Sequence, residues 1–461
     1  MTKNGSITPA ILIISSSFII VIYGLLLLLA TQLDFSNRGV ASEVGINAAD
    51  AGIEYYKWHL NQDSTDYTDG TGQSGPYTHD YFDNSGALVG SYQLDVIPFT
   101  DNSGRVTVKS TGWSTNYPNI RRTISAVFGR SPLTAFAFLH NSNLWIGNEV
   151  TINGPIFTNG GIRMDGTNTS TVQTTKETYT CGAETGCNSP TEKPGIWGNG
   201  GPEELWEFPV PMIDFDSINV DFADLKTEAN NSGLYLGPSG KQGYHITFNA
   251  NGTFTVKTVN TAQTVKGYSF EFGCENITQD IKNEQTLGTF NVSDSPVIFT
   301  EDDVWVDGVV NGKTTVVAGR FPIDTNNANI IILNNLTYLA KNGNHSLGLI
   351  SQKDIIIGLK VPEHLEIDGG MLAQKGRVIR HHYKKQQCSQ GNGTDAIKQE
   401  LIIYGSIISN LSSYWNFSQG PGDPASGFVK TTISYDPNLE STPPDYFPSY
   451  GQFHLISWQE E

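Results

Sequence analysis

Hydrophobic residues form one long, unbroken segment near the start of the chain. Residues 7–30 contain no charged side chain, and at about 1.5 Å per helical residue they can cross the roughly 30 Å hydrocarbon core of a bilayer. The apolar run of a cleaved signal peptide is shorter, about 7–15 residues, and precedes a small-residue cleavage site. We therefore predict a retained transmembrane helix over residues 7–30 and a cytoplasmic leader over residues 1–6. A removed signal peptide is the alternative.

A second apolar pattern continues the helix beyond the membrane. Its positions recur every three or four residues, which places them on one face of a helix with about 3.6 residues per turn. They are Val40, Val44, Ala48, Ala51, Tyr55 and Trp58. We predict that the helix runs to about Leu60 and that this face docks with other helices.

Short runs of alternating apolar and polar residues follow the helix. Residues 90–99, 105–113 and 121–130 show this pattern, which is typical of half-buried strands. We predict that they form a small antiparallel sheet, so that residues 31–130 make one module of stem helix and sheet.

This module resembles a known family. Gly5-Ser6, the apolar run and the fragment AADAGIEYY at residues 48–56 resemble the N-terminal module of PilX-type minor pilins. The resemblance implies a helix that docks with other pilin-like subunits and a prepilin-type cleavage site at Gly5 and Ser6. The family pattern has Phe or Met after the glycine and Glu five residues on, whereas this chain has Ser6 and Ala10, which argues against a major pilin.

From about residue 131 the chain carries short β-type triplets separated by turns rich in Gly, Asn and Asp. Each triplet begins and ends with an apolar residue that can point inward, as in Val304-Trp305-Val306, Ile330-Ile331-Ile332 and Ile355-Ile356-Ile357. Rungs of this kind bury their apolar face only by stacking on neighbours. We predict a parallel β-helix over residues 131–461, with an insertion around residues 165–300; a β-sandwich is the alternative.

The distal region also resembles an uncharacterised bacterial surface domain that accompanies pilin-like stems. The residues that carry this resemblance include INGPIFTNGGIRM at 152–164, SLGLISQKDIIIG at 346–358 and LISWQEE at 455–461. It implies an accessory protein exposed at the cell surface, and it implies no chemistry. The expected fold class is therefore mixed and mainly β.

The charge balance narrows the choice of partners. The formal net charge is −18 with 16% charged residues, which disfavours general nucleic-acid binding because phosphate is repelled. One local concentration of basic residues is a candidate polyanion patch, and a solvated loop is the alternative. It contains Arg377, Arg380, His381, His382, Lys384 and Lys385.

The chain has four cysteines. Cys181 and Cys187 bracket a short polar loop that can close as a disulfide in an oxidising compartment. Two free thiols are the alternative. Cys274 and Cys388 can form a second bridge, although the spacing does not determine connectivity.

Candidate active sites are few. Glu301, Asp302, Asp303 and Asp307 form the best acidic cluster, which suits either calcium or general-acid chemistry or a solvated turn. Trp145, Trp197, Trp206, Trp305 and Trp415 can stack on sugars or serve as core and end caps. We expect no cofactor, no metal and no catalysis, and a pilus-associated structural or adhesive subunit with lipid, pilin-like subunits and a surface glycan as partners. A membrane-tethered enzyme that binds or degrades polysaccharide is the alternative.

Overall fold

The chain forms two compact units. The computed structural model describes residues 7–461 except 100–103, 216–220, 385–387, 389–394 and 421–422. The stem unit comprises Met1–Phe99, Gly104–Arg130 and Gln452–Glu461, and the solenoid unit comprises Thr100–Ser103 and Ser131–Gly451. The division differs from the expected distal domain of residues 131–461, because residues 452–461 return to the stem unit.

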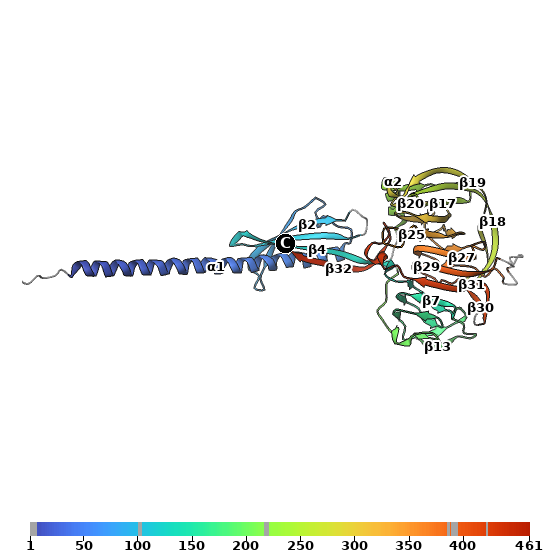
Figure 1. Cartoon of the computed structure of the whole chain (residues 1–461), viewed down its shortest axis with the longest axis horizontal. Coiled ribbons are helices and arrows are strands. Elements are labelled where there is room, and N and C mark those ends of the chain that lie inside the picture. The colour runs from blue at the N-terminus through green and yellow to red at the C-terminus, as the bar shows by residue number, and fades with distance from the viewer. Residues whose placement is uncertain (1–6, 100–103, 216–220, 385–387, 389–394, 421–422) are drawn as a thin grey trace, which may run out of the picture. The chain divides into compact units, whose positions relative to one another are not determined.

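The stem unit combines one long helix with a five-stranded sheet (Figure 1). α1 (Thr8–Gln62) has proline in its first turn, where the fixed φ of proline suits a helix and the missing N–H has no intrahelical partner to lose. The sheet order is β1 (Tyr77–Phe82), β2 (Leu88–Pro98), β3 (Val106–Ser114), β4 (Tyr117–Pro132) and β32 (Ser449–Glu460). β1 to β4 pair in antiparallel fashion. The predicted helix and small antiparallel sheet are thus confirmed.

Small residues bring α1 close to this sheet. A Cβ atom on Gly112 of β3 would lie 2.2 Å from the carbonyl oxygen of Gly45, and one on Gly52 would lie 2.3 Å from Ser110 Oγ. The fully buried residues around this contact include Ala48, Ala49, Ile53, Tyr56, Leu60, Leu94, Val106, Val108, Ile124, Ala126 and Phe128. The missing side chains let the helix backbone rest almost directly on β3.

The carboxyl-terminal strand completes the same sheet. The Phe453 backbone N–H donates to Asn61 Oδ1 at 2.7 Å, and the Glu461 N–H donates to the carbonyl oxygen of Thr123 at 3.0 Å. Lys109 pairs with the side chain of Glu461 at 2.6 Å. The two ends of the chain therefore build one unit, and the solenoid is inserted between β4 and β32.

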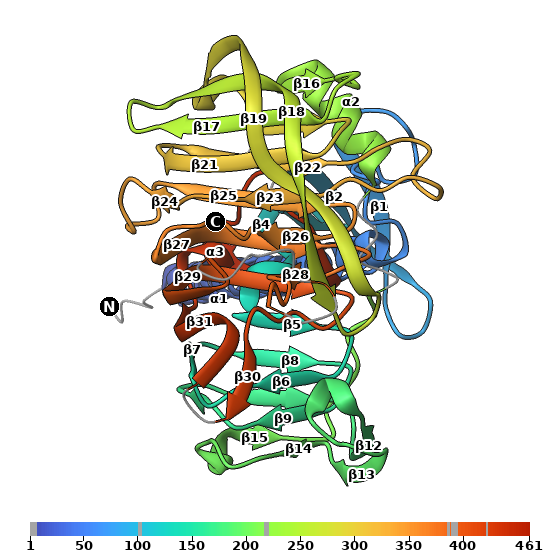
Figure 2. The same cartoon turned by 90° about the vertical axis from the view of Figure 1, so that its right-hand side faces the viewer.

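The solenoid unit is built from ladders of parallel strands, with one antiparallel arm against them (Figure 2). One ladder contains, in spatial order, β16 (Leu234–Leu236), β20 (Val297–Thr300), β22 (Lys313–Ala318), β25 (Ser346–Ser351), β27 (His364–Ala373), β29 (Ile397–Ser409), β5 (Phe138–His140), β8 (Ile156–Thr158), β11 (Val172–Thr174) and β15 (Trp206–Glu207). This confirms the predicted parallel β-helix over the predicted β-sandwich alternative.

Two further ladders make up the other faces. The second contains β21 (Val304–Val310), β23 (Ile330–Ile332), β26 (Ile355–Ile357) and β28 (Val378–Ile379), and then a separate sheet of β6 (Leu144–Ile146), β9 (Ile162–Met164) and β14 (Ile196–Trp197). The third contains part of β21, β24 (Leu336–Tyr338), β27, β29, β31 (Asp423–Ser434), β7 (Val150–Asn153) and β10 (Thr167–Asn168).

The order of rungs in space differs from their order in the chain. The chain joins the stack in its middle at β5, which pairs with both β8 and β29. Rungs then build in one direction to β15, and a second series starts at β16 at the opposite end and stacks back to β29 and β31 (Figure 2). The pairs Phe138–Ile407 and Ile152–Ile433 join the two series.

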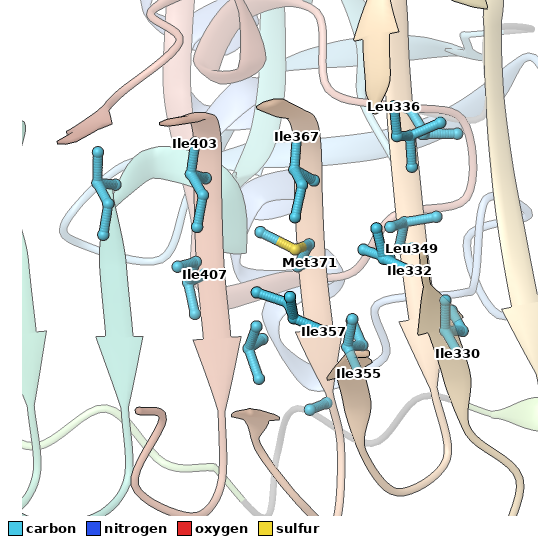
Figure 3. Close-up of a cluster of buried hydrophobic side chains, with 14 of the residues drawn as sticks. Ile330, Ile332, Leu336, Leu349, Ile355, Ile357, Ile367, Met371, Ile403 and Ile407 are labelled. Carbon is cyan, nitrogen blue, oxygen red and sulfur yellow. The ribbon is translucent and has the colours of Figure 1, made fainter. Parts of the chain in front are cut away.

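The triplets alternate between core and outer face as the sequence predicts. Ile330 and Ile332 point into the shared core beside Ile355 and Ile357 of the next rung (Figure 3). Ile331, between the first pair, belongs to a different apolar cluster on the outside of the ladder. At one corner, Gly369 and Gly405 have φ of +145° and +148°, and a Cβ on Gly405 would lie 2.0 Å from the Gly369 carbonyl oxygen, so glycine is required there.

Outward apolar residues on two ladders are covered by other parts of the solenoid unit. On the first ladder, Phe299, Val317 and Ile350 pack with Phe222 and Leu225 of α2 (Phe222–Ser232). On the second, a long antiparallel arm of β18 (Thr253–Ser269) and β19 (Gly273–Asn291) lies across the rungs (Figure 2). The expected insertion at residues 165–300 is therefore mainly this arm, since residues 167–207 continue the stack.

Candidate functional site

The first half of α1 presents apolar side chains that contact no other part of the stem unit. From Ile11 to Phe35 the large hydrophobic side chains are 52% to 80% exposed. In the described part of the chain, one helix is long and apolar enough to cross a membrane, with a mean hydropathy of 2.7 over its most apolar window. Residues 11–35 form the bare half of α1, which in water would be costly because roughly 25 cal/mol is lost per Å² of apolar surface left exposed.

The second half of α1 packs on the chain's own sheet, which corrects the predicted docking face. Of its six residues, Ala48 is fully buried, Val44, Ala51 and Tyr55 are half-buried, and only Val40 and Trp58 remain exposed, at 59% and 58%. The prediction followed apolar side chains, whereas the contact with the sheet follows the small residues Gly45, Ala49 and Gly52. The predicted face is therefore divided between the internal contact and solvent.

Polar side chains fasten the loop after α1 to the helix. His59 Nε2 lies 3.0 Å from Asp66 Oδ2, and the Tyr55 hydroxyl donates to Asp69 at 3.1 Å. Burial and the neighbouring Asp69 raise the pKa of Tyr55 to about 12, so the phenol stays protonated and remains a donor. The end of the stem helix is thus held in place by the loop that follows it.

The predicted cleavage site and the cysteines have different outcomes. Gly5 and Ser6 lie outside the described residues. Cys181 and Cys187 form the predicted disulfide, and Cys274 and Cys388 form the second. The second bridge joins β19 of the arm to the segment that follows β28, so it fixes the tip of the arm to the solenoid.

The predicted polyanion patch is wrong for its central residues, because Arg377, Arg380 and His381 are at most 1% exposed. Arg377 forms ion pairs with Glu271 and with Glu275 of the arm, and His381 Nε2 lies 3.2 Å from Glu275. Burial alone would raise the pKa of Glu275, but hydrogen bonds from His381 and Ser269 and the charge on Arg377 lower it to about 2.

Arg380 and the residues after it have separate environments. Arg380 donates to the carbonyl oxygens of Leu359 and Asp395 at 3.1 and 2.8 Å, and burial lowers its pKa to about 10. The His382 ring packs against Phe417 at a tilt, with ring centroids 4.7 Å apart. Lys384 is exposed, and Lys385 lies outside the described residues. Arg377 and His381 are thus the patch residues whose side chains bind the arm.

The acidic cluster is engaged by internal partners. These are Lys226 for Glu301 at 2.7 Å, Arg320 for Asp302, Asn329 for Asp303 at 2.8 Å and His245 for Asp307 at 3.1 Å. Among the described residues, no group of three or more His, Cys, Asp or Glu side chains is placed to hold a metal ion. The cluster lies along β20 and β21 and binds α2 through Lys226. It is linked to the arm through His245, whose Nδ1 lies 2.7 Å from Glu284 of β19.

The tryptophans separate into buried and surface residues. Trp305 and Trp415 are 1% and 5% exposed and belong to the core or to its cover. Trp206 and Trp197 are half-buried, and Trp145 is 40% exposed. Only Trp145 therefore presents a large part of its ring to solvent in the solenoid unit.

Comparison with solved structures finds a distant structural similarity. No protein-family model matches the chain, and no curated protein matches it. Among solved structures, the crystal structure of the competence-associated pilin ComZ from Thermus thermophilus is similar over 91% of this chain and 97% of that chain, at 14% identity and a TM-score of 0.32. At this identity and TM-score, the similarity supports no conclusion about the fold or function of this chain.

Sequence reasoning missed the arm and the close contact of helix and sheet. The contact had a visible signal, since Gly45, Ala48 or Ala49, and Gly52 recur at helical spacing. The arm had a weaker signal in the long Thr- and Val-rich segment 253–291, whose length exceeds that of any rung. Neither signal alone identifies the surface on which the segment lies.

Proposed function

We propose that this protein is a membrane-anchored, pilin-like subunit that displays its solenoid outside the cytoplasm. The bare half of α1 carries the proposal, because its exposed apolar residues need lipid or neighbouring helices as partners. Residues 11–30 of this half lie in the bilayer, and the end of the half at Phe35, together with Val40 just beyond it, packs laterally against similar helices.

The proposed role is structural and adhesive and involves no catalysis. Support comes from the acidic groups of the solenoid unit, since Glu301, Asp302, Asp303 and Asp307 are all engaged by cations or amides of the same unit. Residues committed to such contacts stabilise the stack and are poorly placed to exchange protons with a substrate. The insertion between β4 and β32 suits display, because the solenoid is held by the chain at both ends.

Co-purification with a matched control tests the proposal. The tagged full-length protein is expressed in its native host with Phe35→Asp and Val40→Asp together, and membrane extracts are analysed for pilin-like proteins by mass spectrometry. We expect at least a tenfold loss of these proteins relative to the unsubstituted chain. The control, Val429→Asp with Leu339→Asp, places the same two charges at exposed residues of the solenoid unit, 40% and 49% exposed, and should leave capture unchanged.

Two results would count against lateral docking. Equal recovery of pilin-like proteins with the double variant and with the control would remove the role of this helix surface. Both aspartates lie beyond residues 7–30 and should not impair membrane insertion. Loss of the double variant from the membrane fraction would therefore mean that this surface contacts lipid and does not dock with other helices.

A further inference from the structure

Three outward side chains lie in register on the part of the solenoid that the arm leaves uncovered. Trp145 of β6 and Trp197 of β14 both pair with Arg163 of β9. Parallel strands in register place such side chains on the same face, one rung apart, at about 4.8 Å. The three residues therefore form a continuous Trp–Arg–Trp stack across successive rungs.

The guanidinium of Arg163 lies between the two indole rings. Its central carbon is 4.3 Å from the centroid of Trp145 and 5.0 Å from that of Trp197. Lys193 lies over Trp197 as well, at 4.6 Å. Two cations therefore lie over the Trp197 ring. Trp145 has Arg163 over its ring, and a Cβ atom on Gly186 would lie 3.0 Å from its Cζ3 and Cη2 atoms. The residue is still 40% exposed, and this exposed part is called its open face.

The exposed indole is held in a defined orientation. Trp145 Nε1 donates to Asp165 Oδ2 at 2.9 Å, and Arg163 Nε donates to the same oxygen at 2.7 Å. Arg163 also donates to the carbonyl oxygen of Thr185 at 3.2 Å, inside the loop closed by the Cys181–Cys187 disulfide. Pre-organisation of this kind lowers the entropy lost when a ligand stacks on the ring.

The position of the stack relative to the arm explains why it is open. The outward residues Trp305, Ile331 and Ile356 on earlier rungs of this face are covered by the arm. The tip of the arm, at Phe270, contacts Tyr414. The Tyr414 hydroxyl accepts a hydrogen bond from the Phe270 N–H at 3.0 Å. Apolar residues are thus used where the face is covered, and a rigid tryptophan remains where the cover stops.

We propose that the open face of Trp145 binds a pyranose ring of a neutral polysaccharide. The apolar C–H face of a sugar stacks on the electron-rich face of an indole. Glu184 accepts a hydrogen bond at 3.0 Å from Asn143 Nδ2, two residues before Trp145, through one carboxylate oxygen. Its other oxygen is the proposed acceptor for a sugar hydroxyl. Acidic polymers are disfavoured, because the net charge is −18 and Arg163 is already neutralised by Asp165.

This site names a ligand class for the proposed adhesive role and rests on that role, whereas it does not depend on the docking of α1 with other helices, which the co-purification experiment tests separately. Isothermal titration calorimetry of the full-length protein in detergent tests it, with cellohexaose and chitohexaose as probes. At least one of the two should bind with one site per chain. Trp145→Ala should weaken that binding at least tenfold, and Trp145→Phe should retain part of it. Glu184→Gln leaves the Trp145 ring in place and should weaken binding less than Trp145→Ala does.

The control is Trp458→Ala, which removes a tryptophan of β32 that is 48% exposed and should leave binding unchanged. Circular dichroism melting of each variant shows whether the solenoid stays folded. Failure of the unsubstituted protein to bind either hexasaccharide would overturn the proposal, as would equal binding by folded Trp145→Ala. Tighter Trp145-dependent binding of oligothymidylate would also overturn it and assign the ring to nucleobase stacking.

Discussion

The stem unit and the solenoid unit differ in how much of their outward apolar surface is covered by other residues of the same unit. In the solenoid unit, outward apolar residues such as Phe299 and Ile331 are covered by α2 or by the arm. In the stem unit, only the second half of α1 is covered, by its own sheet, and the residues from Ile11 to Phe35 are more than half exposed. The solenoid unit covers its own apolar surface, whereas the first half of α1 leaves its apolar side chains uncovered.

Under the proposed function, this difference assigns anchoring and assembly to the stem unit and display to the solenoid unit. A unit that covers its own apolar surface can be presented to the surroundings without aggregating. A helix that leaves its apolar surface bare acquires stability only from lipid or from other helices. Perturbing the two units separately should therefore give effects that stay within the perturbed unit.

The largest effect should come from charge in the bare half of α1. Ile19→Asp with Ile22→Asp places two carboxylates near the middle of residues 7–30, at about 2.5–3.5 kcal/mol each by insertion scales. We expect the full-length protein to leave the membrane fraction on alkaline extraction, while the melting temperature of the solenoid unit stays unchanged. Retention in the membrane pellet would contradict the predicted span, and Leu339→Asp on the solenoid is the matched control.

The two disulfides should differ in their effect on the solenoid unit. Cys274 and Cys388 are 114 residues apart, and Cys181 and Cys187 are 6 apart. In the chain-entropy model, replacing the first pair by serine should lower the free energy of unfolding by about 5 kcal/mol and replacing the second pair by about 2 kcal/mol. Denaturant unfolding of both double variants checks the ranking. Equal destabilisation would mean that the Cys274–Cys388 bridge adds no more to the free energy of unfolding than closure of the short Cys181–Cys187 loop does.

The contact between helix and sheet can be broken at one atom. Gly112→Val should destabilise the stem unit by about 3 kcal/mol, because its Cβ would meet the backbone of Gly45 and Ala49 at 2.2 and 2.5 Å. A Cβ atom on Gly39 of α1 would have no other atom within 4 Å. Gly39→Ala should therefore stabilise the stem unit by about 1 kcal/mol, because alanine favours a helix more than glycine does. Amide hydrogen exchange over residues 41–60 measures both. Equal exchange in the two variants would show that the close approach is unimportant.

A smaller effect concerns pH in the solenoid unit. Burial raises the pKa of Asp368 to about 6, against the Tyr338 N–H and Lys341, which lower it. The folded state therefore favours the protonated acid, and this contribution is complete below about pH 4 and lost as pH rises through about 6. Asp368→Asn stays neutral and should be more stable than the unsubstituted protein at pH 7.5 by about 2 kcal/mol. Melting temperatures between pH 4 and pH 8 check this, and a lower value for the variant at pH 7.5 would contradict it.

Local patterns predicted local structure well. The 3.6-residue period and the alternating runs predicted α1 and β2 to β4, and the triplets predicted inward and outward positions, because these depend only on neighbours in the chain. The order of rungs could not be predicted. Phe138 of β5 pairs with Ile407 of β29, far along the chain, and the apolar triplets are too alike for their sequences to indicate which two are neighbours.

The candidate site was predicted less completely, for the same reason. Arg377 and His381 form part of a basic run in the sequence, and only the arm, about 100 residues earlier, supplies the Glu271 and Glu275 that bury them. The segment around Trp458 lacks strict alternation, and its partner β4 lies more than 300 residues upstream. Burial and charge neutralisation set by such distant segments leave no mark in the local pattern.

Photo-crosslinking from single positions tests the central claim most directly. A photoreactive amino acid is placed at Phe35 of α1 or at Leu339 of the solenoid, 80% and 49% exposed, in cells that produce the full-length protein. We predict crosslinks from position 35 to helices of other pilin-like subunits and none of that kind from position 339. Crosslinks to such helices from position 339, with none from position 35, would contradict the assignment of assembly to the stem.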